Sequence, residues 1–210
     1  RHSTANSMHA EQILFPMELI QIIFEFCNVC DTWDAAVSSP AICIKDGWIS
    51  IEKRDGTHMY NTSAYGTGVI EPGGVQSWTL RMGKHVKCGQ KFYPYIGIIH
   101  DEHSVLQKYQ KSQRWFDSPV NGYQLCLGNG HKRPSGGTGG NKVFAKKCSE
   151  GDVICMTFDA VQWTLAYKIK HGSDEQFTDY GTAFHEIIPR NYRLAAALYN
   201  KALGCSLEML

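Results

Sequence analysis

The stretch from Gly151 to Leu210 decides the fold and reads GDVICMTFDAVQWTLAYKIKHGSDEQFTDYGTAFHEIIPRNYRLAAALYNKALGCSLEML. A Gly-Asp turn opens a predicted strand at Val153–Asp159, and a second strand is predicted at Trp163–Ile169. A polar loop follows, then the motif Gly-Thr-Ala-Phe at Gly181–Phe184, and two further predicted strands complete the stretch. This order of strands and turns predicts a β-structure for the C-terminal part of the chain.

Short β segments continue upstream as far as Ile42. Ile42–Lys45 and Trp48–Lys53 alternate in polarity and are separated by Asp46-Gly47, which is typical of a tight hairpin turn. Strands at this density without intervening helices predict a two-sheet antiparallel sandwich. The remaining predicted strands are Val75–Met82, Tyr93–His100, Gly122–Leu127 and Arg193–Tyr199.

The N-terminal part differs in pattern from the rest. Residues 1–11 are polar and are expected to be a disordered leader or a cloning remnant. Residues 12–31 carry apolar side chains at three- and four-residue spacing, which predicts an amphipathic helix. Residues 32–210 are assigned to the sandwich. Two long irregular segments interrupt its strands, the charged and aromatic Asp101–Asn121 and the glycine-rich Gly128–Asn141, and such loops usually carry the function of a β scaffold.

Composition narrows the classes of function. The chain has 210 residues and a formal net charge of +1, which argues against a nucleic-acid or membrane-surface role. Its eight cysteines fit either a disulfide framework or buried free thiols, and thiols are favoured because most lie in apolar runs of a large chain. No run reaches the ~18 apolar residues of a membrane span and no signal peptide is visible. An intracellular protein, cytoplasmic or nuclear, is expected.

Ordered landmarks give a family resemblance. Gly74-Val75-Gln76-Ser77-Trp78, the Tyr95–Ile99 strand, Gly122-Tyr123-Gln124-Leu125 and the turns after Gly151 occur in the order found in SPRY domains. The resemblance covers residues 33–210, and Leu198-Tyr199-Asn200 brings it nearest to SPRY domains attached to SOCS-box or F-box modules of ubiquitin ligases. It implies an all-β, concanavalin-like two-sheet sandwich with a short N-terminal α-helix. It also implies a module that binds proteins, is not an enzyme and needs no cofactor or metal.

The resemblance implies a binding surface as well. In the SPRY–SOCS-box group, loops at one end of the sandwich capture a short linear peptide. Arginine offers a planar fork of donors, and tyrosine supplies rigid contact area with a polar tip. An alternative is that the two tyrosines only cap the core. Laid on this sequence, the implied partner-binding residues are Arg54, Thr57, His58, Tyr109, Trp115 and Tyr199.

The chain departs from this group at two places. The Trp-Gly-Trp of the group is reduced to Asn121-Gly122-Tyr123, and the glycine-rich loop has no counterpart. The resemblance implies a protein or linear peptide as partner, with ligase components in addition, and these departures leave the identity of the partner unspecified. Phe15–Ile20 also resembles the first helix of an F-box. A helix packed on the edge of the sandwich is the preferred interpretation, because strands begin by Ile42 and leave no room for the three helices of an F-box.

Other functional patterns are weaker. His100-Asp101-Glu102-His103 is interpreted as a solvated polar turn, because it lacks a further obvious ligand, and a metal-dependent hydrolase there stays an open alternative. Trp48, Trp163 and Asn121 leave a lectin-like carbohydrate or small-ligand site open. Cys27-Asn28-Val29-Cys30 is a lone CxxC, which favours core packing over zinc. The glycine-rich loop lacks the spacing of a phosphate-binding loop, because Val143 follows Lys142 where Ser or Thr is needed.

Overall fold

The computed structural model describes residues 31–50, 61–83, 94–106, 121–133, 143–199 and 205–210. The chain divides into two units, Arg1–Cys30 and Asp31–Leu210. The predicted leader, and the predicted helix except for its last residue, lie outside the described residues. Within the described ranges the only helix is a single turn at His103–Leu106.

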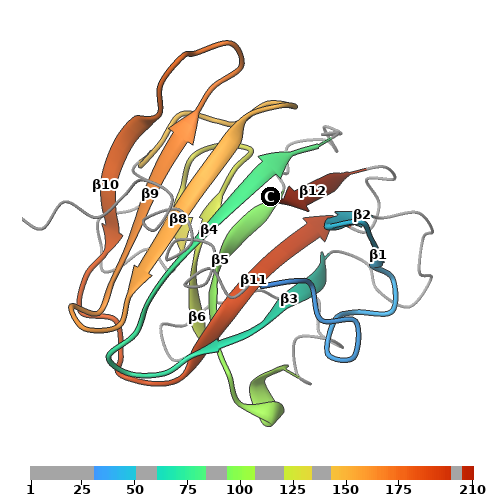
Figure 1. Ribbon diagram of the computed structural model, residues 1–210, viewed down its shortest axis with the longest axis vertical. Coiled ribbons are helices and arrows are strands. Elements are labelled where there is room, and N and C mark those ends of the chain that lie inside the picture. Colours follow the sequence, from blue (N-terminus) through green and yellow to red (C-terminus); the bar gives the residue numbers. More distant parts are fainter. Residues whose placement is uncertain (1–30, 51–60, 84–93, 107–120, 134–142, 200–204) are drawn as a thin grey trace, which may run out of the picture. The chain divides into compact units, whose positions relative to one another are not determined.

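The second unit is a sandwich of two antiparallel sheets (Figure 1). The larger sheet has the order β1-β2-β12-β4-β8-β9-β10 and the smaller one the order β3-β11-β5-β6-β7. The predicted two-sheet antiparallel sandwich is therefore confirmed. The strands are β1 (Cys43–Lys45), β2 (Trp48–Ser50), β3 (Asn61–Ile70), β4 (Val75–Met82), β5 (Tyr95–His100), β6 (Gly122–Cys126), β7 (Lys132–Arg133), β8 (Val153–Asp159), β9 (Thr164–Lys170), β10 (Thr178–Phe184), β11 (Tyr192–Tyr199) and β12 (Ser206–Met209).

The main core lies between the two sheets. Along β8 and β9 every second side chain is buried, which is the pattern expected for strands with one face on the core. Ile154, Met156 and Phe158 of β8 belong to this core, together with Ile96 and Ile98 of β5. Alternation in the sequence thus places the two sheets face to face.

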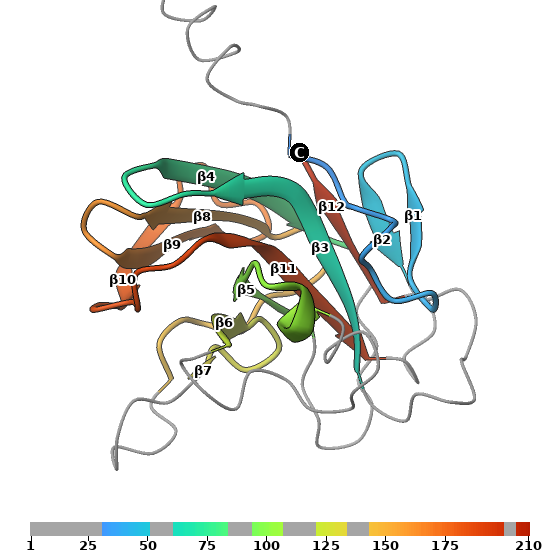
Figure 2. The same cartoon turned by 90° about the horizontal axis from the view of Figure 1, so that it is seen from below.

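The smaller sheet is also covered on its outer face. Tyr65, Ile99, Ala195 and Ala197 form a second apolar cluster there with Leu106. Leu106 ends the helical turn, which lies on the outer side of this sheet in Figure 2. β11 is therefore buried on both faces, which explains its nearly continuous run of apolar residues.

One long strand, β3, was not predicted. Its sequence, NTSAYGTGVI, is rich in Ser, Thr and Gly and lacks a clear alternation. It pairs with β11 from Asn61 to Ile70, with a register shift opposite Arg193–Ala195. Tertiary pairing, rather than local propensity, places this segment in the sheet. Trp163, predicted as the first residue of a strand, lies instead in the turn before β9 with a φ of 54°.

The register defines two ends of the sandwich. At the first, which we call the loop end, Asn61 pairs with Tyr199, and Tyr95 pairs with both Ala197 and Cys126. At the second, the hairpin end, Tyr192 pairs with both Ile70 and His100, and Ile99 pairs with Gly122. Each end gathers the connections of several strands.

Candidate binding surfaces at the two ends of the sandwich

The loop end brings three long connections to neighbouring positions. Residues 51–60 lead into β3, residues 84–93 lie between β4 and β5, and residues 200–204 follow β11. Because Asn61 pairs with Tyr199, and Tyr95 pairs two residues away with Ala197, the flanks of all three connections are adjacent. A rigid ladder that presents several loops at one end is the usual arrangement of a binding scaffold.

Four of the predicted binding residues belong to this end. Arg54, Thr57 and His58 lie in the connection before β3, outside the described residues. Tyr199 is the last residue of β11, and only its backbone is described. The structure thus brings together the described flanks of the segments that carry these residues, and the roles of the side chains stay predictions.

The other two predicted residues, Tyr109 and Trp115, lie outside the described residues in a connection of the opposite end. That connection leaves β5 after His100 and returns at Asn121, whose carbonyl accepts a hydrogen bond from the His100 amide at 2.9 Å. The register therefore does not place its flanks beside the other three connections. Its first turn runs onto the outer face of the smaller sheet, where Leu106 is buried.

Asp152, His171 and Tyr180 form a polar cluster at the loop end that the sequence did not reveal. Asp152 is only 3% exposed, and its carboxylate lies 2.8 Å from Nδ1 of His171. Nε2 of His171 lies 3.1 Å from the hydroxyl of Tyr180, and the amide of Gly172 donates to Asp152 at 2.7 Å. Both ring nitrogens of the histidine are engaged, so the cluster joins β8, β9 and β10 and holds the start of the β9–β10 turn.

Lys132 closes the edge strand β10 against further pairing. Its Nζ donates to the carbonyl of Ala183 at 2.7 Å and lies 5.8 Å and 5.6 Å from the ring centres of Phe144 and Phe184. Asp179 accepts from the amide of Gly181 at 2.8 Å, at a register shift in the same strand. A bulge in an edge strand, and a lysine from a neighbouring strand that occupies one of its carbonyls, both work against strand addition.

At the hairpin end, Arg193 of β11 holds two acidic segments. Its Nε donates to Asp101 at 2.6 Å, and one of its Nη atoms lies 3.4 Å from Asp34 and 3.2 Å from the carbonyl of Gly66. The Arg193 side chain is only 11% exposed. This network ties β3, β5, β11 and the segment after Asp31 together.

The His100–His103 segment, for which a metal site was the alternative to a polar turn, is paired internally and with Arg193. Asp101 is paired with Arg193, and Glu102 lies 3.6 Å from Nδ1 of His100 and accepts from Ser104 at 2.6 Å. Burial, and then the nearby Arg190 guanidinium, lower the pKa of His100. In the part of the chain that the structure describes, no group of three or more His, Cys, Asp or Glu side chains is arranged to hold a metal ion.

The aromatic residues considered for a lectin-like site are divided between the sheets. Trp48 belongs to β2 of the larger sheet, and Trp163 precedes β9 and contacts Phe158 edge-to-face at 6.2 Å. Asn121 precedes β6 of the smaller sheet. The three residues therefore do not share one sheet face. The CxxC pair at Cys27 and Cys30 lies outside the described residues.

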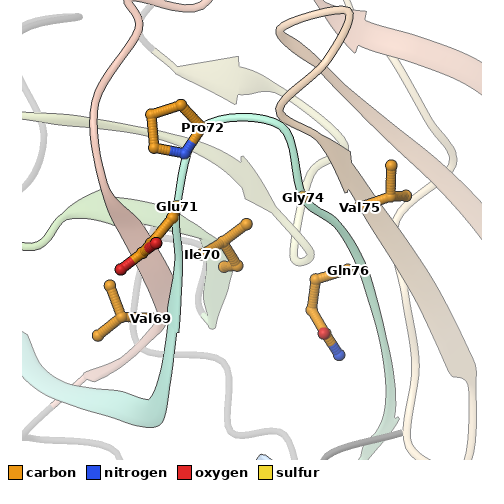
Figure 3. A pocket seen from close by; sticks show the side chains of 7 residues that line it. All are labelled: Val69, Ile70, Glu71, Pro72, Gly74, Val75 and Gln76. Carbon is orange, nitrogen blue, oxygen red and sulfur yellow. The ribbon is translucent and has the colours of Figure 1, made fainter. Parts of the chain in front are cut away.

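A hollow of about 440 Å³ lies at the hairpin end, beside the turn between β3 and β4. Its wall is formed by Val69, Ile70, Glu71 and Pro72 on one arm and by Gly74, Val75 and Gln76 on the other (Figure 3). Ile70 and Gln76 point into the space between the arms, with Pro72 at the turn (Figure 3). No feature of the sequence predicted this hollow.

A further observation concerns membranes. Among the described residues, no helix is both long enough and apolar enough to cross a bilayer.

Comparisons with known proteins establish the fold. No family model and no curated protein sequence matches the chain. Among solved structures, the chain is similar to the SPRY domain of human HERC1, with 10% identity, a TM-score of 0.58, and coverage of 84% of this chain and 96% of that domain. The fold is therefore SPRY-type, as the landmarks of the sequence implied.

Two further solved structures resemble the chain. Stonustoxin matches with 12% identity and a TM-score of 0.51 over 86% of this chain, which spans 28% of the stonustoxin chain. A legume lectin-like domain from Entamoeba histolytica matches with 12% identity and a TM-score of 0.44, covering 99% of this chain and 95% of that domain.

Proposed function

We propose that this chain is a protein-interaction module that binds a peptide or a partner-protein surface through the connections at its loop end. The observation that carries the proposal is the pairing of Asn61 with Tyr199, next to that of Tyr95 with Ala197. It anchors three long connections side by side on a ladder that is buried on both faces. The SPRY-type fold supports the same conclusion, because that fold is a β-sandwich binding module.

The binding residues are those that the family resemblance assigns. Arg54, Thr57, His58 and Tyr199 act from the loop end, while Tyr109 and Trp115, on the connection that leaves β5 at the hairpin end, are assigned by the resemblance alone. Such an interface buries about 800 Å² per partner or less, and a few aromatic and arginine anchors carry most of its affinity. The module performs no chemistry of its own and uses no cofactor.

The setting we propose is substrate selection for a ubiquitin ligase inside the cell. The resemblance to SPRY domains of SOCS-box and F-box adaptors supports this setting. The thiol of Cys148, which is buried and forms no disulfide, suits a reducing compartment. Recovery of ligase subunits with the full chain from a cell lysate is the expected result, and a preparation free of them in repeated captures contradicts this setting.

A displayed library of random dodecapeptides tests the binding function itself. The wild-type chain is expected to enrich a defined set of peptides. The double variant Tyr109→Ala with Tyr199→Ala is expected to bind them at least tenfold more weakly with little change in melting temperature. Thr79→Ala, a substitution near the middle of β4 in the larger sheet, serves as the matched control.

Two results would overturn the proposal. One is the absence of any enriched peptide on the wild-type chain. The other is a double variant that binds the enriched peptides as well as the wild type does. A large fall in the melting temperature of the double variant would instead assign the two tyrosines to the core.

A further inference from the structure

One described segment crosses the loop end from the smaller sheet to the larger one. It comprises residues 143–152, between β7 and β8, and we call it the crossing segment. The amide of Phe144 donates to the carbonyl of Gly130 at 2.8 Å, and the amide of Cys148 donates to the carbonyl of Leu127 at 2.7 Å. Since Leu127 directly follows β6, the first half of the crossing segment lies at the loop end of the smaller sheet.

The second half of the crossing segment reaches the loop end of the larger sheet. The amide of Gly151 donates to the carbonyl of Met82 at 2.7 Å, and the amide of Met82 donates to the carbonyl of Asp152 at 2.8 Å. Arg81 pairs with Val153, so β4 ends where β8 begins (Figure 1). Backbone hydrogen bonds therefore hold the crossing segment against both sheets.

The crossing segment also lies beside both flanks of the connection between β4 and β5, residues 84–93. Met82, which bonds to Gly151, is near its start. Pro94 follows its end, and the carbonyl of Pro94 accepts from the amide of Leu127 at 2.9 Å. Because Leu127 is also bonded to the crossing segment, side chains of that segment are presented next to one of the three connections assigned to peptide binding.

Positive charge gathers on this part of the loop end. Lys146 and Lys147 are adjacent and exposed, between buried Ala145 and Cys148. In the part of the chain that the structure describes, neither lysine forms an ion pair. The sequence of the neighbouring connection contains three further lysines and no acidic residue.

The acidic residues of the crossing segment do not offset this charge. The buried Asp152 accepts from the amide of Ser149 at 2.9 Å and from the amide of Gly172 at 2.7 Å, and it lies 2.8 Å from Nδ1 of His171. Glu150 is the other acidic residue of the segment, and it is exposed. Two exposed lysines thus stand against a single exposed glutamate.

The hairpin end has charge of the opposite sign. Arg193 is shared there by Asp34 and Asp101, while Glu71 and Asp159 form no ion pair within the described residues. A nucleic acid carries one charge every few ångströms and favours a long basic surface. A short basic patch on a chain of net charge +1 suits a short acidic segment of a protein instead.

We propose that Lys146 and Lys147 make the loop end selective for acidic segments of partner proteins. The proposal rests on the peptide-binding function proposed for this end, and it adds the chemistry of the ligand. Asp or Glu side chains of the bound segment pair with the two ammonium groups. A lysine ammonium acts as a point charge on a flexible stem, so the acidic residue can occupy more than one position in the segment.

A counter-selection experiment tests the two lysines. A random dodecapeptide library is selected on the wild-type chain and depleted on the double variant Lys146→Glu with Lys147→Glu. The double variant Lys146→Arg with Lys147→Arg keeps both charges and is the matched control. Lys45→Glu, at an exposed lysine beside the β1–β2 turn, controls for the change in overall charge.

The expected survivors are enriched in Asp and Glu relative to the starting library. Synthetic copies are expected to bind the Glu double variant about tenfold more weakly than the wild type, the Arg double variant and Lys45→Glu. Added salt is expected to weaken binding to the wild type more than binding to the Glu double variant. Amide NMR shifts on titration are expected at residues 144–152.

Survivors without enrichment in acidic residues, or survivors that bind the Glu double variant as tightly as the wild type, would refute the role of the lysines. If such peptides still lose binding with Tyr199→Ala, the peptide-binding function stands and only the lysine proposal fails. A library that yields no enriched peptide overturns both.

Nucleic acid is the competing ligand. A DNA duplex of about 20 base pairs that binds the wild type more tightly than the survivors do, and loses binding in the Glu double variant, would refute the assignment to a protein segment. Thermal melting of each variant establishes that lost binding is not lost folding.

Discussion

Asp31 accepts a hydrogen bond from the indole nitrogen of Trp78 at 2.8 Å, although 47 residues separate them in the chain. Its other oxygen accepts from Thr67 Oγ1 at 2.9 Å and from the amide of Gly68 at 2.8 Å. A Cβ added at Gly66 would come closer to this carboxylate than real Cβ atoms do. One side chain thus fixes β3 against β4, and glycine makes room for it.

Replacement of Asp31 by Ala is expected to lower the free energy of unfolding by about 3 kcal/mol. The substitution leaves three donors without their charged acceptor, and the loss of such bonds is costly. Urea denaturation followed by tryptophan fluorescence measures the change. Asp174→Ala, at an exposed aspartate in the β9–β10 turn, is expected to change stability by less than about 0.5 kcal/mol. Equal losses in the free energy of unfolding for the two variants would show that the hydrogen bonds of Asp31 do not stabilise the fold.

Replacement of Arg193 by Met is expected to destabilise the fold by about 3 kcal/mol, because it leaves Asp34 and Asp101 without their cation. Arg81→Ala removes the 2.8 Å pair with Glu208, in which the arginine side chain is 46% exposed. That loss is expected to cost less than about 1 kcal/mol. Chemical denaturation at low and high salt compares the two, and an Arg193 variant as stable as the Arg81 variant would contradict the buried role of Arg193.

His100 is expected to make stability fall with acid. Burial and Arg190 lower its pKa below the ordinary 6.5, while Glu102 and Asp101 oppose the shift in part. The unfolded chain then binds a proton at a higher pH than the folded chain does. This contribution to stability is complete above about pH 6.5 and is lost as the pH falls through the folded-state pKa.

The comparison that isolates this effect is between wild type and His100→Gln. The free energy of unfolding is measured from pH 8 to pH 5, and the variant is expected to lose less stability than the wild type on acidification. Parallel curves for the two proteins would show that His100 does not titrate differently on folding.

The cysteines are expected to differ in reactivity. Burial raises the pKa of Cys148 to about 12 and also raises the pKa of Cys126. Since the thiolate is the reactive form, native protein at pH 8 is expected to resist iodoacetamide at both and at buried Cys205. Among the five cysteines that the structure describes, partly exposed Cys43 and Cys155 are expected to react first. Peptide mass spectrometry reads the sites, unfolded protein gives the control in which all react, and rapid native labelling of Cys148 would contradict its burial.

Much of the sandwich could be predicted from local sequence. β8 has an alternating apolar pattern and β4 contains landmark residues, and neither signal depends on which strand lies beside it. β3 could not, since its Ser, Thr and Gly residues acquire strand geometry only from Asp31 and β11. The hollow could not be predicted either. The β8–β9 turn lies beside the β3–β4 turn only through the register of β4 and β8, which no local pattern specifies.

The peptide-binding residues were predicted from the family resemblance alone. Arg54 and Tyr109 lie on connections between strands. The sequences of these connections lack the two-residue alternation that sets the direction of a side chain in a strand. The pairing of the strands locates the flanks of those connections, and the side chains remain to be tested by the double variant.

The length of the strands gives the molecule a further property. β4 has eight residues and runs between the two ends, which are therefore about 25 Å apart. An extended segment of fewer than about eight residues bound at the loop end does not reach the hairpin end. A longer ligand that engaged both ends would bridge the domain, which would then act as a rigid spacer. The avidity of such a ligand would depend on how closely its two binding segments match that fixed spacing.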